Sequence, residues 1–102
     1  METSSLKGIF ISFNQAYYEL ILELFDSLSI RGFTAWEELQ GRGSHRGDPH
    51  YGNHAWPVLN SAIFVVLPAS KAPELLEALH QMDQRTEDQG LRAFEWDITR
   101  SI

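Results

Sequence analysis

The chain has 102 residues, of which 43% are hydrophobic and 22% are charged, as in one ordinary globular domain. It has no cysteine, which excludes disulfides, iron–sulfur clusters and thiolate metal sites. Acidic residues outnumber basic ones by 14 to 8, and a net charge of −6 disfavours a general nucleic-acid binder. No apolar run is long enough to span a membrane, and residues 1–7 lack the apolar core of a signal peptide. We therefore expect a cytoplasmic protein that neither binds nucleic acid nor inserts into a membrane.

The first part of the chain predicts a strand, a helix and a second strand. Residues 8–13 alternate in the manner of a strand, and residues 33–39 form a weaker, mixed strand. Between them, apolar residues recur with helical spacing over 15–31, a helix that Asn14 would cap and Gly32 would end. The buried stripe of this helix is expected to contain Tyr17, Leu20, Ile21, Leu24, Phe25 and Leu28.

The last part of the chain predicts a strand, a helix and a final strand. Residues 62–67 are almost continuously apolar, which is typical of a strand buried on both faces. Ser70 would cap the following helix, Pro73 falls in its first turn, and the polar stretch 83–90 ends it. Residues 91–98 alternate again. The buried stripe of this second helix is expected to contain Ala72, Leu75, Leu76, Leu79 and Met82.

The resulting order, β-α-β-β-α-β, is that of the ferredoxin-like α+β fold in a single domain over residues 1–102. This fold has a four-stranded antiparallel sheet with both helices on one face. Because of the alternation, the large aromatic residues cannot all face the helices. On an uncovered sheet face they would indicate a subunit interface, with scattered surface aromatics as the alternative. The residues concerned are Phe10, Trp36, Phe64 and Trp96.

The long segment 41–57 between the second and third strands has no apolar period. Loops of this length in a compact domain are usually either functional or disordered. It carries two arginines against one aspartate on an otherwise acidic chain, which favours an anionic ligand. Glycine backbone N–H groups, a hydroxyl and guanidinium groups are suitable donors to such a ligand, although a glycine-rich turn is the alternative. The candidate ligand-binding residues are Gly41, Arg42, Gly43, Ser44 and Arg46.

The same segment permits a second hypothesis, a divalent metal site. His45, His50 and His54 lie close together with Asp48 between them, and these side chains suit zinc, copper or nickel. Their spacing matches no established zinc motif, so exposed loop histidines are the alternative. His80, on the second helix, is expected at the surface.

No arrangement of residues indicates catalysis. The serines lack the context of a nucleophile elbow. Glu37 and Glu38 are adjacent in a predicted strand, so they should point to opposite faces and not act together on one substrate. We therefore expect no catalytic residues and no enzymatic activity, with a small enzyme that works in an inter-subunit cleft as a third hypothesis.

The order of elements, together with the sequence QGRGSHRG at 40–47, resembles the PII-like signalling superfamily, small trimeric proteins related to nitrogen regulatory protein P-II. The stretch 40–47 stands at the position of the start of that family's T-loop, so 41–57 would be a T-loop-like segment. The apolar strand ending in Leu67 and Pro68, followed by a helix, is also similar to the family.

The resemblance implies a homotrimer with a small-molecule effector in clefts between subunits. Gly41, Arg42 and Gly43 would lie at the cleft, and the loop would act on a target protein or transporter. The family's glycine-rich segment for ATP phosphates is replaced here by residues 84–90, with one glycine and two acids. Tyr51 lacks the family's modification context. ATP binding of the usual kind is therefore not expected, and the effector or cofactor is unidentified.

Overall fold

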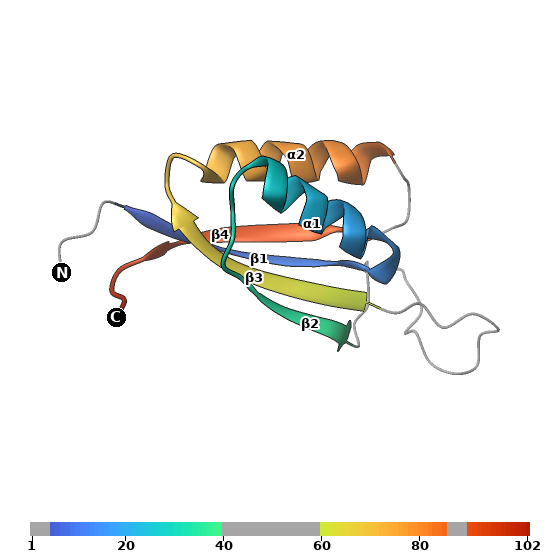
Figure 1. Ribbon diagram of the computed structural model, residues 1–102, viewed down its shortest axis with the longest axis horizontal. Helices are drawn as coiled ribbons and strands as arrows, with labels where there is room; N and C mark the ends of the chain where they lie inside the picture. The colour runs from blue at the N-terminus through green and yellow to red at the C-terminus, as the bar shows by residue number, and fades with distance from the viewer. Residues whose placement is uncertain (1–4, 40–59, 86–89) are drawn as a thin grey trace.

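The structure is a computed structural model that describes residues 5–39, 60–85 and 90–102. Its elements follow the expected order β-α-β-β-α-β (Figure 1). They are β1 (Leu6–Asn14), the 3₁₀ turn η1 (Gln15–Tyr17), α1 (Tyr18–Ser27), β2 (Thr34–Leu39), β3 (Asn60–Pro68), α2 (Ala72–Arg85) and β4 (Arg92–Ile98).

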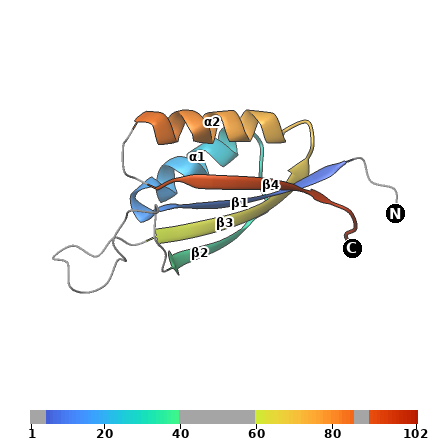
Figure 2. The same ribbon diagram turned by 180° about the vertical axis from the view of Figure 1, so that it is seen from behind.

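The four strands form one antiparallel sheet in the order β2-β3-β1-β4. β1 lies in the centre, where Leu6 is opposite both Pro68 of β3 and Ile98 of β4. Both helices lie against the same face of this sheet, as the two opposite views show (Figures 1 and 2). These features confirm the ferredoxin-like α+β fold. In the part of the chain that the structure describes, no helix is long and apolar enough to cross a membrane.

The hydrophobic core fills the space between the sheet and the helices. Alternate residues of β1 and β3 point toward the helices, which follows from the two-residue side-chain period of a strand. Burial of each such side chain contributes roughly 1.5–3 kcal/mol. The core side chains that are at most 2% exposed include Ile9, Ile11, Phe13, Ile21, Phe25, Ile63, Val65, Leu67, Leu75 and Leu79.

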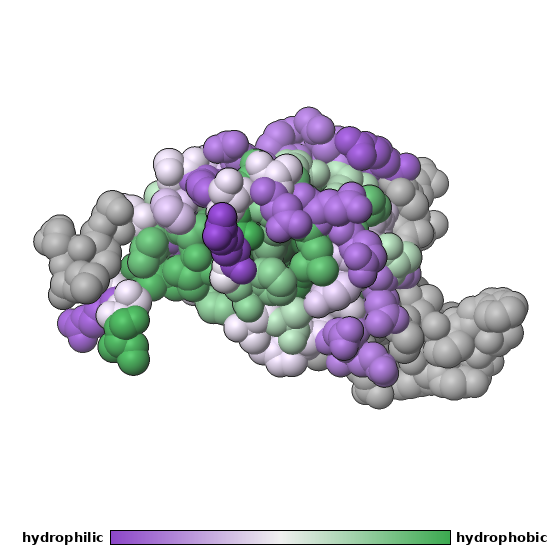
Figure 3. All heavy atoms as spheres, in the orientation of Figure 1, coloured by the Kyte–Doolittle hydropathy of each residue, from purple (hydrophilic) through white to green (hydrophobic). Residues whose placement is uncertain are grey.

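The expected helical stripes are confirmed with one exception. Ala72, Leu75 and Leu79 of α2 are buried, and Leu76 and Met82 pack partly against the core. On α1, Leu20 is 50% exposed, so its assignment to the buried stripe was wrong. Leu20 lies about 100° around the helix from the buried Ile21, at the edge of the stripe. Hydrophilic side chains cover the outer surface of the helical layer (Figure 3).

Helix α1 is shorter than expected at both ends, because the 3₁₀ turn η1 takes the first three residues of the predicted helix 15–31. The Asn14 side chain accepts a hydrogen bond from the Ala16 N–H at 2.8 Å, so Asn14 caps η1, whereas Tyr17 at the start of α1 provides no side-chain cap. The helix was expected to end at Gly32, but α1 ends at Ser27. The left-handed position is taken by Ser29, with φ of 61°.

The end of α1 is a Schellman motif. The Ser29 N–H donates to the Asp26 carbonyl at 3.1 Å, and the Ile30 N–H donates to the Phe25 carbonyl at 2.8 Å. Ile30 and Phe25 are both buried in the core, which is the apolar contact that accompanies this motif. The predicted C-terminal boundary of this helix was therefore wrong. Glycine is the usual sequence signal for a left-handed residue after a helix, and here that position is occupied by a serine.

The turn before α2 also differs from the expectation. α2 begins at Ala72. Its first hydrogen bond runs from the Leu75 N–H to the Lys71 carbonyl, so Lys71 is the capping residue. Ser70 therefore lies in the turn and does not cap the helix. Pro73 falls in the first turn, as predicted. The Lys71 ammonium group reaches across to α1 and donates to the carbonyls of Leu28 at 2.8 Å and Ser29 at 3.3 Å. A cation therefore stabilises the C-terminal end of α1.

Strand β3 is fully buried on one face but only partly buried on the other, contrary to the expectation for 62–67. Ile63, Val65 and Leu67 face the helices and are buried. On the other face Phe64 is half-buried and Val66 is 41% exposed, because neither α1 nor α2 covers that face.

Candidate functional site

All the ligand and metal candidates from the sequence lie in residues 40–59, outside the described residues. These are Gly41, Arg42, Gly43, Ser44 and Arg46 for an anion, and His45, His50 and His54 for a metal. Within 5–39, 60–85 and 90–102, no three histidine or acidic side chains are grouped as metal ligands. His80 is exposed, as expected.

The two ends of this segment are nevertheless fixed. Leu39, the last residue of β2, pairs with Asn60, the first residue of β3. Further into the sheet, Trp36 pairs with Ala62. The segment therefore leaves and re-enters the sheet between two neighbouring strands, at the end of the sheet opposite the chain termini (Figure 1).

A β-bulge lies immediately before this point. Between the two pairs just described, Glu37 and Glu38 together stand opposite Ser61 alone. The expectation that the two glutamates alternate between faces assumed a regular strand, and the register shift interrupts that regularity at these residues. The buried Ser61 hydroxyl donates to the Glu37 carbonyl at 2.7 Å.

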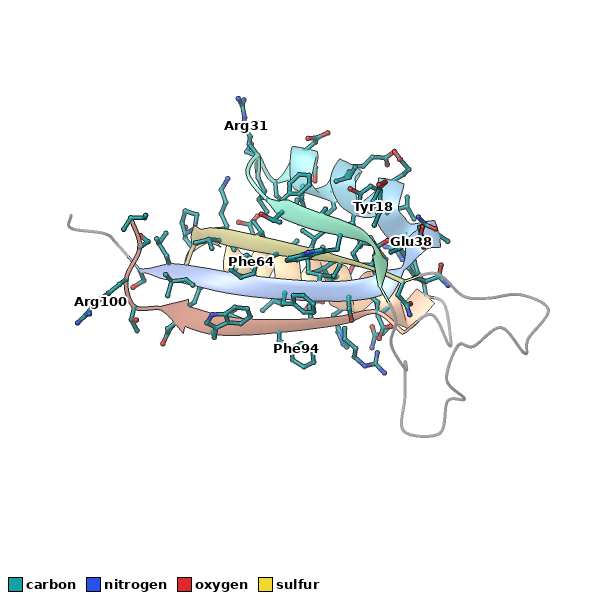
Figure 4. All side chains as sticks on the ribbon, turned by 90° about the horizontal axis from the view of Figure 1, so that it is seen from below. Tyr18, Arg31, Glu38, Phe64, Phe94 and Arg100 are labelled. Atoms are coloured by element: carbon teal, nitrogen blue, oxygen red, sulfur yellow. The ribbon has the colours of Figure 1, made fainter. Side chains whose placement is uncertain are left out.

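The face of the sheet opposite the helices carries a surface of aromatic and aliphatic side chains, which we name the open face. Figure 4 views the sheet from this side, with Phe64 on β3 and Phe94 on the edge strand β4. Phe94 is 59% exposed, and Trp36 and Trp96 are each 44% exposed. The open face comprises Gly8, Phe10, Trp36, Ala62, Phe64, Val66, Phe94 and Trp96.

Aromatic pairs organise the open face. Phe64 and Trp96 stack with their ring centroids 5.6 Å apart and an interplanar angle of 18°. Phe10 and Trp36 form a tilted pair at 6.4 Å. Phe10 also stands between Phe64 and Phe94 in the register of the sheet. The predicted separation of these aromatics from the helical face is therefore confirmed, and it leaves a continuous apolar surface of the kind that marks an interaction site.

Gly8 gives this surface its shape. A Cβ atom at Gly8 would lie 3.0 Å from Cδ1 of Ile98 and 3.1 Å from Cε2 of Trp96. The indole thus lies directly over the backbone of the central strand. A strand glycine is the residue that allows such a close approach.

The hollows that the described residues form include two on the helical side. One, of about 400 Å³, is lined by α2 and the start of β4, where Arg92 lies 3.7 Å from the Asp83 carboxylate and donates to the Leu91 carbonyl at 2.7 Å. The other, of about 410 Å³, lies at the end of α1 beside Arg31 and Phe33. Both are open to solvent at one side, and neither brings together the residues singled out from the sequence.

The clearest electrostatic feature lies on the other edge of the sheet. Lys7 of β1 hydrogen-bonds Asp97 and lies 3.7 Å from Glu95, both on β4. The hydrogen bond that the Lys7 ammonium donates to the Asp97 carboxylate raises the pKa of Lys7 above its ordinary value of 10.5. This pairing ties the edge strand to the centre of the sheet and engages the Lys7 ammonium with two carboxylates.

Two residues that shape the site, Ser61 and Phe94, were not predicted from the sequence. Ser61 lay just outside the predicted strand 62–67, and its only signal was a small polar residue beside a buried run. Phe94 lies within the predicted strand 91–98 but was not named among the interface aromatics. Its alternation with Glu95 and its position two residues before Trp96 carried that information.

Comparisons with known proteins give matches at the level of structure. No protein-family model and no curated protein matches the sequence. Among solved structures, CPII from Thiomonas intermedia K12 bound to ADP and bicarbonate is 26% identical, with a TM-score of 0.72. The match covers 92% of this chain and 86% of that chain. A second structure of CPII, a nitrogen regulatory PII-like protein, with ADP, AMP and bicarbonate, is 25% identical over the same shares, with a TM-score of 0.75.

The same fold appears in more distant proteins. The GlnK–ATP complex from B. subtilis is 13% identical, with a TM-score of 0.73, and the match covers 99% of this chain and 89% of that chain. At this identity the match supports the fold alone. Together with the CPII structures, it matches the order of elements and the sheet described above.

Proposed function

We propose that this chain, which its fold identifies as a divergent PII-like protein, is a non-enzymatic regulator that binds a small anionic ligand and acts on a target through residues 41–57. The observation that carries the proposal is the likeness to CPII over 92% of the chain, because the matched structures hold ADP and bicarbonate. The target is a protein or a transporter, and the small molecule is the signal that controls it.

The working form is a homotrimer whose open faces meet around a threefold axis. The support is the exposed aromatic surface, which includes Phe94, Trp36 and Trp96. Large apolar side chains at this exposure are unfavourable in water and are enriched at the centres of interfaces. A cyclic trimer covers one such surface on each copy in a closed ring.

The ligand site is proposed at the base of the 41–57 segment, in the cleft between subunits. Trp36 and Ala62 belong to the open face and lie only a few residues from the paired ends of the segment, Leu39 and Asn60. A ligand bound at that base would therefore lie beside the proposed subunit contact. The anion would be held by backbone N–H groups of Gly41 and Gly43, the hydroxyl of Ser44 and the guanidinium groups of Arg42 and Arg46.

Titration calorimetry tests this proposal with ADP and bicarbonate, separately and together. The chain as it exists should bind at least one of them. Arg42→Ala should weaken binding by about 1.5–3 kcal/mol, the range for hydrogen bonds to charged groups. Arg100→Ala is the matched control, because it removes the same charge at the opposite end of the sheet from the end of β2 (Figure 4). Absence of binding to both anions, or equal losses in the two variants, would contradict the proposal.

The second candidate is a PII-like metal-binding protein, favoured by His45, His50 and His54 within a short segment. Zn²⁺ would then bind the full chain, and His50→Ala or His54→Ala would abolish binding while Arg42→Ala would not. Zinc affinity would fall below about pH 6, because protonated imidazoles cannot ligate a metal. The same calorimetric titrations, with Zn²⁺ in place of the anion, distinguish the two candidates.

A further inference from the structure

The bulge in β2 depends on a buried side chain of the neighbouring strand. Ser61 is 0% exposed and is the buried polar residue of the core region that the structure describes. Its hydroxyl donates to the Glu37 carbonyl at 2.7 Å, a short and well-formed bond. A bulge leaves one residue of the strand outside the regular ladder, so a carbonyl there needs a donor other than the partner backbone. Ser61 supplies that donor.

The bulge changes which residues pair where the strand ends. Continuing regularly from the pair of Trp36 and Ala62, the residue opposite Asn60 would be Glu38. In the structure it is Leu39. Beyond the bulge, the register of β2 is therefore displaced by one residue relative to a regular ladder.

We infer that Ser61 is a positioning residue that fixes this register, and with it the residue and direction at which the chain leaves the sheet after β2. The side-chain period of a strand is two, so a slip of one residue moves each side chain beyond it to the other face. Without the hydroxyl, the Glu37 carbonyl loses its buried donor. The regular ladder, in which Glu38 pairs with Asn60, then competes with the bulged one.

The consequence for function rests on the proposed ligand site. Gly41, the first proposed ligand-binding residue, is two residues beyond Leu39. A displacement of the strand end by one residue therefore shifts the start of the proposed site relative to the open face. Ser61 would act on the ligand only through this displacement, without touching it.

The first experiment measures the register itself and needs no ligand. Cross-strand NOEs and amide hydrogen exchange are recorded for the full chain, for Ser61→Ala and for Ser61→Thr, which keeps the hydroxyl. We expect contacts of Leu39 with Asn60 in the natural chain and in Ser61→Thr. In Ser61→Ala we expect contacts of Glu38 with Asn60 to appear, and β2 amides to exchange at least tenfold faster. Ser61→Cys, of similar size but a weak donor, replaces Ser61→Ala if that variant does not fold.

Ser12→Ala is the matched control. Ser12 lies on the adjacent strand β1, opposite Ala62, and within the described residues its hydroxyl makes no hydrogen bond comparable to that of Ser61. Its removal should leave the register and exchange of β2 unchanged. An unchanged register and exchange in both Ser61→Ala and Ser61→Cys would overturn the inference, as would an equal effect of Ser12→Ala.

The second experiment measures ADP affinity for the same variants. We expect Ser61→Ala to bind at least fivefold more weakly and Ser61→Thr to stay closer to the natural chain. If the natural chain binds no ADP, the proposed function fails at this ligand while the NOE pattern still decides the role of Ser61. If the register changes but ADP affinity does not, Ser61 fixes the strand and the proposed link to the ligand is refuted.

Discussion

Replacement of Phe94 by serine should weaken the association of this chain with itself. Phe94 lies on the edge strand β4, on the open face, and is 59% exposed in the single chain (Figure 4). An aromatic side chain has roughly 200 Å² to bury. The exposed part is therefore about 120 Å², which at about 25 cal/mol per Å² gives an upper limit near 3 kcal/mol per subunit.

The effect on association should be smaller than this limit, because ordering of side chains offsets part of the gain on assembly. A loss of about 2 kcal/mol per subunit is a reasonable expectation, which amounts to about 6 kcal/mol for three equivalent subunits. Since the midpoint concentration of a monomer–trimer equilibrium varies with the square root of its dissociation constant, that midpoint should rise about a hundredfold.

Sedimentation equilibrium over a wide micromolar range measures this midpoint directly. Leu20→Ser is the matched control, because Leu20 is 50% exposed but lies on α1, on the other side of the sheet. It should leave the midpoint unchanged. A natural chain that stays at the monomer mass of 11.7 kDa at every concentration would refute the reasoning, as would an equal shift in both variants.

Two further predictions concern substitutions to or from glycine, and both are measured by urea unfolding at one protein concentration. Ser29→Gly should stabilise the chain by about 0.5–1 kcal/mol, because Ser29 holds a φ of 61° that glycine adopts without strain. Ser27→Gly, two residues earlier in α1, should destabilise it, and the reverse order would contradict the Schellman assignment. Gly8→Ala should destabilise by about 1–3 kcal/mol, because its Cβ would press on the indole above it. Gly32→Ala is the control, because no atom of the described residues lies within 4 Å of its new Cβ, so it should lower the free energy of unfolding less than Gly8→Ala does. Equal losses of stability in the two variants would show that the indole moves aside without cost.

The parts of the fold that the sequence predicted are those with a strong period. Ile9, Ile11 and Phe13 define the buried face of β1 by strict alternation, and Leu75 and Leu79 define the buried face of α2 by helical spacing. These patterns are set by how much apolar surface each element must bury, so local sequence contains them. The order of elements and the fold class follow from them.

The errors occurred where tertiary contacts decide the local conformation. α1 ends at Ser27 because the backbone bond from Ile30 to Phe25 closes the helix over the core, and no glycine marks the point. The bulge at Glu37 exists because Ser61, distant in sequence, supplies a buried donor. Neither partner is visible within a short window of sequence. The strand 62–67 was judged by its hydrophobicity, which does not distinguish a face covered by helices from one left for another subunit.

The candidate site was predictable in outline only. Alternation placed Phe10, Trp36, Phe64 and Trp96 away from the helices, and the sheet confirms this. The anion and metal candidates in 41–57 stay predictions. Their geometry depends on a segment without a period of its own, so no pattern in the sequence fixes which side chains converge.

The central position of β1 has a consequence for how the chain must fold. β1 is synthesised first, yet its neighbours in the sheet are β3 and β4. β1 and β2, the strands of the first half of the chain, are not adjacent, and neither are β3 and β4, the strands of the second half. Leu6 reaches its partner Ile98 only after nearly the whole sequence is available. Pairings of such large separation are slow, because the loop between them must be closed before any hydrogen bond forms. During synthesis, the side of β1 that pairs with β4 therefore remains an unpaired edge until the last strand has emerged, and a chain interrupted before β4 would present that edge to other chains.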